Sequence, residues 1–369
     1  MQFIDLKKQY SILKEKIDTG IHKVLDHGMY IMGPEISELE NKLADYTGRK
    51  HCVAVSSGTD ALLMPLLAWG IGPGDAVFTT PFTFIATAEV ISLVHATPVF
   101  VDIDEKTYNI DPAKLEEKIK YVIENTNLKP KLIIPVDLFG LPADYTEIQK
   151  IAEKYNLLVL EDAAQGFGGE LNGLKAGKFG DAAATSFFPA KPLGCYGDGG
   201  AIFTDDDDLF QKLVSIRVHG FGSDRYTHVR IGINGRIDSM QAAVLLAKLS
   251  IFDEEIEKRQ LVAKMYNERL KDKLVKPFTP AGFKSAWAQY SLLAESESHR
   301  TDIQNQLKDA GVPTAIYYPI PLHLQEAFSS LGGKTGYFPV SEEICKRIFS
   351  IPFHPYLEEQ DINFICNLI

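Results

Sequence analysis

The sequence of 369 residues is longer than one hydrophobic core usually supports, so it predicts two domains. Hydrophobic residues make up 45% and charged residues 24%, which is the balance of an ordinary globular protein. The formal net charge of -11 argues against a nucleic-acid backbone or an anionic membrane as the main partner, although a local pocket can still be positive.

The chain shows no pattern typical of export or membrane insertion. The first residues, MQFIDLKKQY, lack the basic and apolar regions of a signal peptide. The longest apolar stretch, 61–71, contains Pro65 and is too short to cross a bilayer. The four cysteines lie far apart without a CxxC motif, which predicts reduced thiols and no metal site. We therefore expect a cytoplasmic enzyme.

In chain order, the N-terminal part alternates short β-rich runs with helical stretches. The predicted strands are 52–56, 76–80, 97–101, 131–136, 157–161, 183–188 and 200–204. The first five are separated by segments long enough for a crossover helix, which predicts an α/β fold with a mostly parallel sheet and helices on both faces. The gap before the last strand is short and rich in Gly and Pro, which favours an antiparallel edge strand.

The C-terminal part begins with a long helical pattern. From Ser239 to about Lys273, apolar residues interleave with Glu and Lys at helical spacing. Beyond it we expect a smaller α/β unit with strands near 285–294 and 313–319. The predicted domains are residues 1–250 and residues 251–369.

Polar residues follow the predicted strands, where α/β sheets bind their ligands. Gly58 and Thr59 come after the first strand and open a helix, a pattern that suits both a phosphate site and a simple helix cap. Phe84 follows the second strand and is placed either to cover a flat ring or to fill the core.

Two charged residues end later strands. Asp162 closes the fifth strand, and a buried carboxylate there requires a cation such as a pyridinium, an Arg or a metal. If the cation is a pyridinium ring that carries a hydroxyl group, the Gln165 side chain would reach that hydroxyl. Lys191 lies past the sixth strand in a Gly-rich loop, where desolvation lowers the pKa of an amine as a Schiff-base lysine requires; taken alone, the segment also fits a surface lysine.

Two further segments carry candidate groups. Asn234 offers a neutral donor and Arg236 a fork suited to a carboxylate or phosphate, although either can cap a loop. Tyr317, Tyr318 and His323 share a Pro-rigidified loop that lies either over a hydrophobic edge or against a ligand.

Together these segments resemble a known enzyme family. The motifs SSGTDAL, PFTFIATA, EDAAQGFG, SFFPAKPLGCYGDGGA, GINGRIDSMQAA and YYPIPLH are similar to those of the sugar-nucleotide aminotransferases of the DegT/DnrJ/StrS type, and the resemblance covers essentially the whole chain in order. It implies a fold type I enzyme that uses pyridoxal 5'-phosphate (PLP), with a seven-stranded sheet and a smaller C-terminal α/β domain.

The resemblance also implies residue roles. Lys191 corresponds to the lysine that holds the cofactor as a Schiff base, and Asp162 to the carboxylate on the pyridine nitrogen. The other residues implied to bind the cofactor are Gln165 near the ring hydroxyl, Phe84 stacked on the ring, and Gly58, Thr59 and Ser186 on the phosphate. Asn234 corresponds to a phosphate ligand donated by the other subunit, which implies a homodimer with shared sites.

The implied reaction moves an amino group from L-glutamate, through pyridoxamine 5'-phosphate, to a keto sugar of a nucleotide sugar. The subgroup most resembled aminates C3 of a UDP-2-acetamido-2-deoxy-3-oxo-hexuronic acid for O-antigen synthesis. We expect Arg230 or Arg236 to bind the uronate carboxylate, and Tyr317, Tyr318 and His323 to line the substrate side. Tyr317 departs from the His of that subgroup, which leaves the exact sugar open.

Three alternatives use the same scaffold. A sugar dehydratase would carry His in place of Lys191, which this chain does not. An enzyme that aminates C4 of a 4-keto-6-deoxy sugar nucleotide is distinguished only by substrate assays. A non-catalytic PLP-fold binding protein is disfavoured by the intact Lys191, Asp162 and Gln165.

Overall fold

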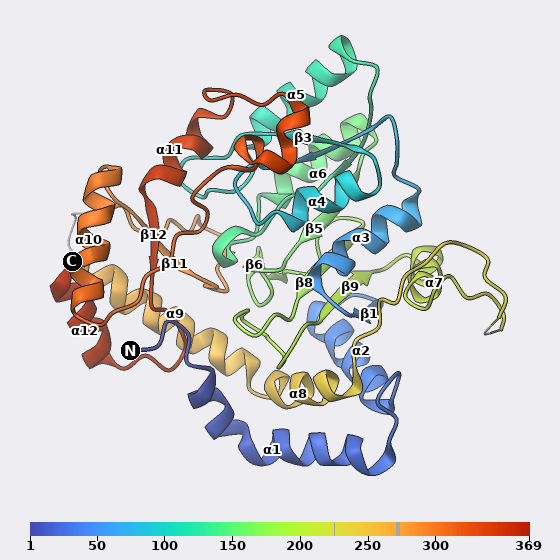
Figure 1. The fold of residues 1–369 in the computed structure, drawn as a ribbon, viewed down its shortest axis with the longest axis horizontal. Coiled ribbons are helices and arrows are strands. Elements are labelled where there is room, and N and C mark those ends of the chain that lie inside the picture. The colour runs from blue at the N-terminus through green and yellow to red at the C-terminus, as the bar shows by residue number, and fades with distance from the viewer. Residues whose placement is uncertain (225, 271–273) are drawn as a thin grey trace.

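A seven-stranded sheet forms the centre of the larger part of the molecule (Figure 1). The computed structural model describes residues 1–224, 226–270 and 274–369. The strands of this sheet are β1 His51–Val55, β2 Asp75–Thr79, β3 Thr97–Phe100, β4 Lys129–Ile133, β5 Leu158–Asp162, β8 Ala182–Ser186 and β9 Gly200–Thr204. All seven predicted strands are therefore confirmed, with bounds that differ by at most three residues.

The order of the strands is β1-β9-β8-β5-β4-β2-β3. The pairs from β3 to β8 are parallel, whereas β9 runs antiparallel to both of its neighbours. The antiparallel direction of β9 is confirmed, but its expected place at an edge is wrong. Ala201 pairs with Ala54 on one side and Thr185 on the other, because β9 turns straight back beside β8 and fills the gap next to β1.

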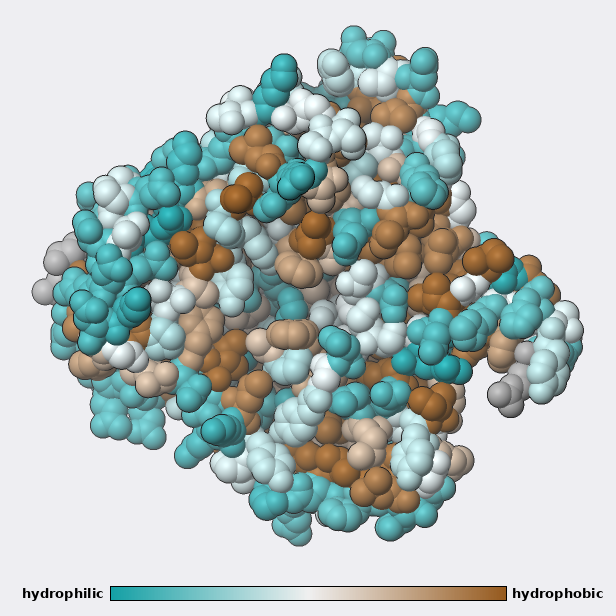
Figure 2. Space-filling model, viewed as in Figure 1, coloured by the Kyte–Doolittle hydropathy of each residue, from teal (hydrophilic) through white to brown (hydrophobic). Residues whose placement is uncertain are grey.

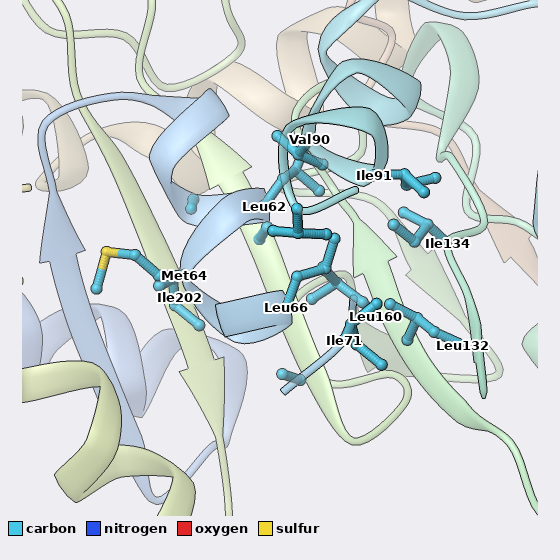
Figure 3. Close-up of a cluster of buried hydrophobic side chains, with 14 of the residues drawn as sticks. Leu62, Met64, Leu66, Ile71, Val90, Ile91, Leu132, Ile134, Leu160 and Ile202 are labelled. Carbon is cyan, nitrogen blue, oxygen red and sulfur yellow. The ribbon is translucent and has the colours of Figure 1, made fainter. Parts of the chain in front are cut away.

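Helices cover both faces of this sheet, because both sets of alternating strand residues are apolar. They are α1 Leu6–His27, α2 Pro34–Thr47, α3 Gly58–Trp69, α4 Ala86–Leu93, α5 Pro112–Asn125, α6 Tyr145–Tyr155, α7 Asp207–Ile216 and α8 Ser239–Leu249, with the short turn η1 Leu138–Gly140. Figure 3 shows one face, where Leu62 and Leu66 of α3 and Val90 of α4 lie near Leu160 and Ile202 of the strands. The α/β fold with helices on both faces is confirmed.

The predicted helix from Ser239 to about Lys273 is two helices, α8 and α9 Phe252–Arg269. The break falls at Ser250, whose hydroxyl donates to the Ala247 carbonyl at 2.7 Å and so satisfies the end of α8. Lys273, where the predicted helix ends, lies outside the described residues.

The C-terminal part has a separate hydrophobic cluster around a two-stranded sheet. Its elements are β11 Tyr290–Leu293, α10 Glu297–Asp309, η2 Leu322–Leu324, η3 Glu326–Leu331, α11 Pro339–Arg347, β12 Ile348–Ile351 and α12 Glu359–Leu368. The strand predicted at 285–294 is confirmed only in its second half. The one predicted at 313–319 is wrong, because Pro313 and Pro319 lack the N–H groups of a ladder and only Ala315 forms a bridge, to Ser350.

The division at residue 250 stays a prediction, and the packing of α9 bears on it. Phe252 and Ile256 belong to a cluster under the large sheet, whereas Val262 and Tyr266 belong to the C-terminal cluster. A third, small sheet also joins the two parts, through β6 Glu170–Leu171, β7 Leu174–Lys175 and β10 Phe283–Lys284.

None of the described helices combines the length and apolar character needed to cross a bilayer.

Two buried carboxyl groups lie side by side beneath the end of β5. One Asp137 oxygen accepts from the Tyr145 hydroxyl at 2.8 Å and from the Ala143 N–H at 3.0 Å. The other has no donor among the described residues and lies beside Glu161, which accepts from two backbone N–H groups. Burial, and then the negative charge of Glu161, raise the pKa of Asp137 well above its usual value. We infer that the Asp137 carboxyl is protonated and donates a hydrogen bond to the Glu161 carboxylate.

This proton predicts how stability depends on pH. A carboxyl whose folded-state pKa is raised stabilises the fold fully below its unfolded pKa of about 3.9, and loses that contribution as the pH rises through the folded pKa. Asp137→Asn should fold well and show less loss of stability at alkaline pH, since an amide donates without titrating. Asp137→Ala should cost about 1–3 kcal/mol at neutral pH, since it leaves buried donors unpaired.

Urea unfolding across a pH series measures both effects. The matched control is Asp302→Asn, since Asp302 is exposed on α10. An asparagine variant at position 137 that is as unstable as the alanine variant would contradict the inferred proton.

Candidate active site

The candidate residues gather where three strands of the large sheet end. Asp162 is the last residue of β5, Ser186 is the last residue of β8, and Gly58 opens α3 just after β1. These strands run in the same direction, so their carboxyl ends lie along one edge of the sheet. Lys191 lies in the loop that follows β8. The fold thus brings together the groups that the sequence places at strand ends.

Asp162 is the buried anion of this cluster, with 4% of its surface exposed. The Thr87 hydroxyl donates to one of its oxygens at 2.8 Å, and the Ala164 N–H donates to the other at 3.2 Å. Burial raises the pKa of Asp162, while these two donors and the charge of Lys191 oppose the rise. The carboxylate is held in place and still lacks a full charge partner, which is the environment that a cationic ligand atom would stabilise.

Lys191 is the amine that faces this carboxylate. Its side chain is partly exposed, yet burial among protein atoms lowers the pKa of the amine, and the charge of Asp162 opposes that shift only in part. A desolvated amine loses its proton more easily than a surface lysine and is the better nucleophile. This setting favours the Schiff-base interpretation of Lys191 over that of an ordinary surface lysine, and the role stays a prediction.

The start of α3 forms a corner suited to an anion. Ser57 caps the helix by accepting from the Asp60 N–H at 3.1 Å. Among the hydrogen bonds of the described residues, none uses the N–H groups of Gly58 and Thr59, which point out of the first turn with the positive end of the helix dipole. A Cβ on Gly58 would lie 2.6 Å from Cβ of Ser186, so only glycine lets that hydroxyl approach the turn. The cap and the anion site are thus compatible.

An aromatic wall stands on the other side of the cluster. Gln165 accepts from the Phe139 N–H at 2.7 Å and donates to the Tyr318 hydroxyl at 3.0 Å. The Tyr318 ring lies 6.4 Å from that of Phe84 and 6.0 Å from that of Tyr317. Phe84 is 58% exposed, so its side chain does not fill the hydrophobic core, which was one of the two interpretations of this residue. Its ring is available to cover a flat ligand.

His323 occupies a different setting from the other residues of its motif. It is 3% exposed, its Nε2 lies 3.0 Å from a Glu342 oxygen, and its ring packs on Phe338. Burial lowers the pKa of His323, against the pull of Glu342. Its contact with substrate stays a prediction, and this burial disfavours it.

Arg230, Asn234 and Arg236 lie on the segment between α7 and α8. Arg236 pairs with Val55 through the backbone, so it lies at the end of β1, and its buried Nε has no acceptor among the described residues. Asn234 is exposed beside Val218, and Arg230 is exposed as well. Part of the segment between α7 and α8 projects from the molecule (Figure 1). Within one chain, Arg236 therefore lies at the end of β1, on the side of the cluster.

One contact in the cluster was not found from the sequence. Thr87, which holds Asp162, lies in the motif PFTFIATA three residues after Phe84, and that spacing places both at the start of α4. A prediction that a helix begins near Ala86 would have made the Thr87 hydroxyl a candidate for the site.

Comparison with known proteins identifies the family. Residues 11–369 match the DegT/DnrJ/EryC1/StrS aminotransferase family. A UDP-2-acetamido-2-deoxy-3-oxo-D-glucuronate aminotransferase of Pseudomonas aeruginosa is 48% identical over 99% of this chain and 98% of its own.

Solved structures agree with this match. A DegT DnrJ EryC1 StrS aminotransferase from Brucella abortus superposes with a TM-score of 0.97 at 51% identity, over 100% of this chain and 98% of its own. NtdA from Bacillus subtilis, solved with bound cofactor PMP, gives a TM-score of 0.87 at 31% identity, over 99% and 82% of the two chains. This chain belongs to the DegT/DnrJ/EryC1/StrS aminotransferase family.

Proposed function

We propose that this protein is a PLP-dependent sugar aminotransferase that moves an amino group from L-glutamate to C3 of a UDP-2-acetamido-2-deoxy-3-oxo-hexuronic acid. The observation that carries the proposal is the desolvated amine of Lys191 beside the buried carboxylate of Asp162. The relative from Pseudomonas aeruginosa, named for that reaction and similar along nearly its whole length, supports the choice of substrate.

The residues of the cluster fit PLP. Lys191 would hold the cofactor covalently through Nζ, and Asp162 would pair with the pyridine nitrogen, which supplies the charge partner that the buried carboxylate lacks. The remaining contacts would be Gly58, Thr59 and Ser186 on the phosphate, Phe84 on the ring face and Gln165 near the ring hydroxyl. When bound, the protonated ring withdraws electrons from the carbon that carries the transferred nitrogen.

Lys191 and its neighbours then perform the proton transfers. With the cofactor and substrates bound, the Lys191 Nζ would accept a proton from Cα of the amino donor and would deliver one to C3 of the sugar. The lowered pKa of Nζ suits both roles, since burial makes the unprotonated amine more accessible than it is on a surface lysine. Thr87 keeps the Asp162 carboxylate fixed during these steps, and the Phe84 and Tyr318 rings cover the site against water.

Arg236 is the best placed cation for the uronate carboxylate. Its Nε is buried and lacks an acceptor among the described residues, which is costly unless a ligand supplies one. Its backbone position beside Val55 puts it at the same sheet edge as Gly58. We propose that its guanidinium binds the sugar carboxylate, with Tyr317 and Tyr318 on the substrate side.

We further propose a homodimer with shared sites. Tyr226 and Ile231 on the projecting segment are 85% and 88% exposed, and apolar side chains gather beside α3 and α7 on that side of the molecule (Figure 2). Exposed apolar surface of this kind is typical of an interface. Docking of this segment on a second copy would carry Arg230 and Asn234 to the partner's site. All four cysteines are free thiols, which supports a cytoplasmic location. We also propose that the aminated sugar is used in O-antigen synthesis.

The first prediction concerns Lys191. Borohydride treatment of the PLP-loaded protein should attach the cofactor to Lys191 only, as read by peptide mass. Lys191→Ala should remain unlabelled and lose at least about 10²–10⁴-fold in turnover, since it removes the proton-transfer group. A wild-type protein that is not labelled at this position, or an alanine variant that keeps its turnover with glutamate, would contradict the proposal.

The second prediction concerns the sugar. Arg236→Ala should lower kcat/KM for the 3-keto uronate by about 10–100-fold more than for the matching neutral 3-keto sugar, as loss of a charged hydrogen bond predicts. Arg230→Ala is the matched comparison. Equal losses on the two sugars for both variants would reject carboxylate recognition, and turnover only of 4-keto-6-deoxy sugar nucleotides would reject the substrate.

The third prediction concerns the shared site. Lys191→Ala and Asn234→Asp should each be nearly inactive alone, the second because it places a negative charge where a phosphate would bind. Refolding the two together should restore part of the activity, since a mixed dimer would contain one intact site. If native mass spectrometry detects mixed dimers but the mixture recovers no activity, the two subunits do not share their sites.

A further inference from the structure

Lys248 is a buried lysine to which no role has been given above. It lies near the end of α8 with 1% of its surface exposed. Its ammonium donates to the Gly194 carbonyl at 2.6 Å and lies 4.4 Å from the centre of the Tyr196 ring. Both partners belong to the loop between β8 and β9, which carries Lys191. Burying an ammonium is costly, and here the hydrogen bond and the cation–π contact that help to compensate both come from that one loop, beside the more general attraction of Glu255 on α9.

The internal packing of the loop connects Gly194 to Lys191. A Cβ on Gly194 would lie 2.6 Å from the carbonyl oxygens of Phe188 and Pro189, so the second half of the loop rests directly on the first. The Lys191 N–H donates to the same Phe188 carbonyl at 2.9 Å. Any displacement of Gly194 therefore disturbs the turn from which the Lys191 side chain extends.

A second residue of α8 holds the same loop. Gln241 accepts from the Tyr196 N–H at 2.8 Å and donates back to the Tyr196 carbonyl at 3.4 Å. Gln241 fixes the backbone of Tyr196, while Lys248 fixes its ring and the Gly194 carbonyl. The helix thus holds the loop at two points, one of which is charged.

The charge of Lys248 is set by groups from three elements. Glu255 of α9 faces it and is itself bound by Gln9 of α1 at 3.0 Å and by the Tyr356 hydroxyl. The Cys195 thiol and the Tyr196 ring face it from the loop, and the ring of Tyr10 on α1 packs edge-on against the Tyr196 ring at 6.3 Å. Burial lowers the pKa of Lys248 to about 8, against the pull of Glu255 and then Cys195.

We propose that Lys248 is a positioning residue for Lys191, and that its ammonium holds in place the loop between β8 and β9. The proposal rests on the proposed function, since it assigns Lys248 to the support of the amine at position 191. A neutral amine keeps a weaker hydrogen bond to Gly194 and loses the cation–π contact with Tyr196, so the loop is freed without unfolding α8.

Hydrogen–deuterium exchange of the cofactor-free full-length protein tests the clamp. After correction for the intrinsic effect of pH, the amides of Cys195 and Tyr196 should exchange at least about tenfold faster in Lys248→Met at pH 7, as the loss of about 1.4 kcal/mol of local stability predicts. In the wild type the same amides should lose protection as the pH rises through about 8, and this change should be absent from Lys248→Met. Lys248→Arg should retain protection across that range.

Lys178→Met is the matched control, since Lys178 also donates to a backbone carbonyl, that of Gly48 at 2.7 Å, but from outside the loop. It should leave exchange at Cys195 and Tyr196 unchanged. Equal protection in the wild type and Lys248→Met at pH 7, or the same alkaline loss in both, would overturn the proposal. Should the methionine variant fail to fold, the wild-type titration and the arginine variant still decide, since constant wild-type protection from pH 7 to 10 also rejects it.

A second readout separates this proposal from the proposed function. In Lys248→Met loaded with PLP, borohydride should still label Lys191. The kcat of the variant should be lower than that of the wild type, and it should lack the fall at alkaline pH that we expect of the wild type. If Lys191 is unlabelled in the wild type, the proposed function fails whatever the exchange data show. If labelling is normal and the kcat–pH profiles of the two proteins coincide, only the role of Lys248 is rejected.

Discussion

The site depends on a charge imbalance buried at the end of β5. The Asp162 carboxylate is taken out of water by the sheet, and the only cation that acts on it in the described structure is the amine of Lys191, whose own charge is disfavoured by the same burial. Neither group can be fully ionised without cost, so both are suited to a ligand that brings a ring cation and an electrophilic carbon. Thr87 and the Ala164 N–H hold the Asp162 carboxylate in place.

A supporting layer of polar groups lies under the residues that would touch a ligand. Asp137 lies beside Asp162, since its N–H donates to the Asp162 carbonyl at 3.0 Å. Its carboxyl accepts from the Ala143 N–H and so closes the turn that contains Phe139, whose N–H donates to Gln165. Lys248 supports the other side, under the loop of Lys191. Buried polar groups of this kind are costly individually, and together they define a single arrangement of the site.

The strands and the strand-end residues could be predicted because they are local features: apolar runs for the sheet, and Gly, Asp and Lys at the points where those runs stop. The place of β9 inside the sheet could not, because it depends on pairing with both β1 and β8. Thr87 and Lys248 were missed for a related reason. Their partners lie 75 and 54 residues away along the chain, and neither residue looks unusual in its own segment.

The direction of β9 has a consequence for the lysine loop. Because β9 is antiparallel to β8 and Ser186 pairs with Gly200, the loop leaves and re-enters the sheet at the same edge, as a hairpin connection. A parallel successor would have required a longer crossover to the opposite end of the sheet, and only one end of that connection would then lie at the site. With both ends fixed on adjacent strands, most of the entropy of closing this loop is lost during folding. The loop then loses little further conformational entropy when the Lys191 amine binds a ligand.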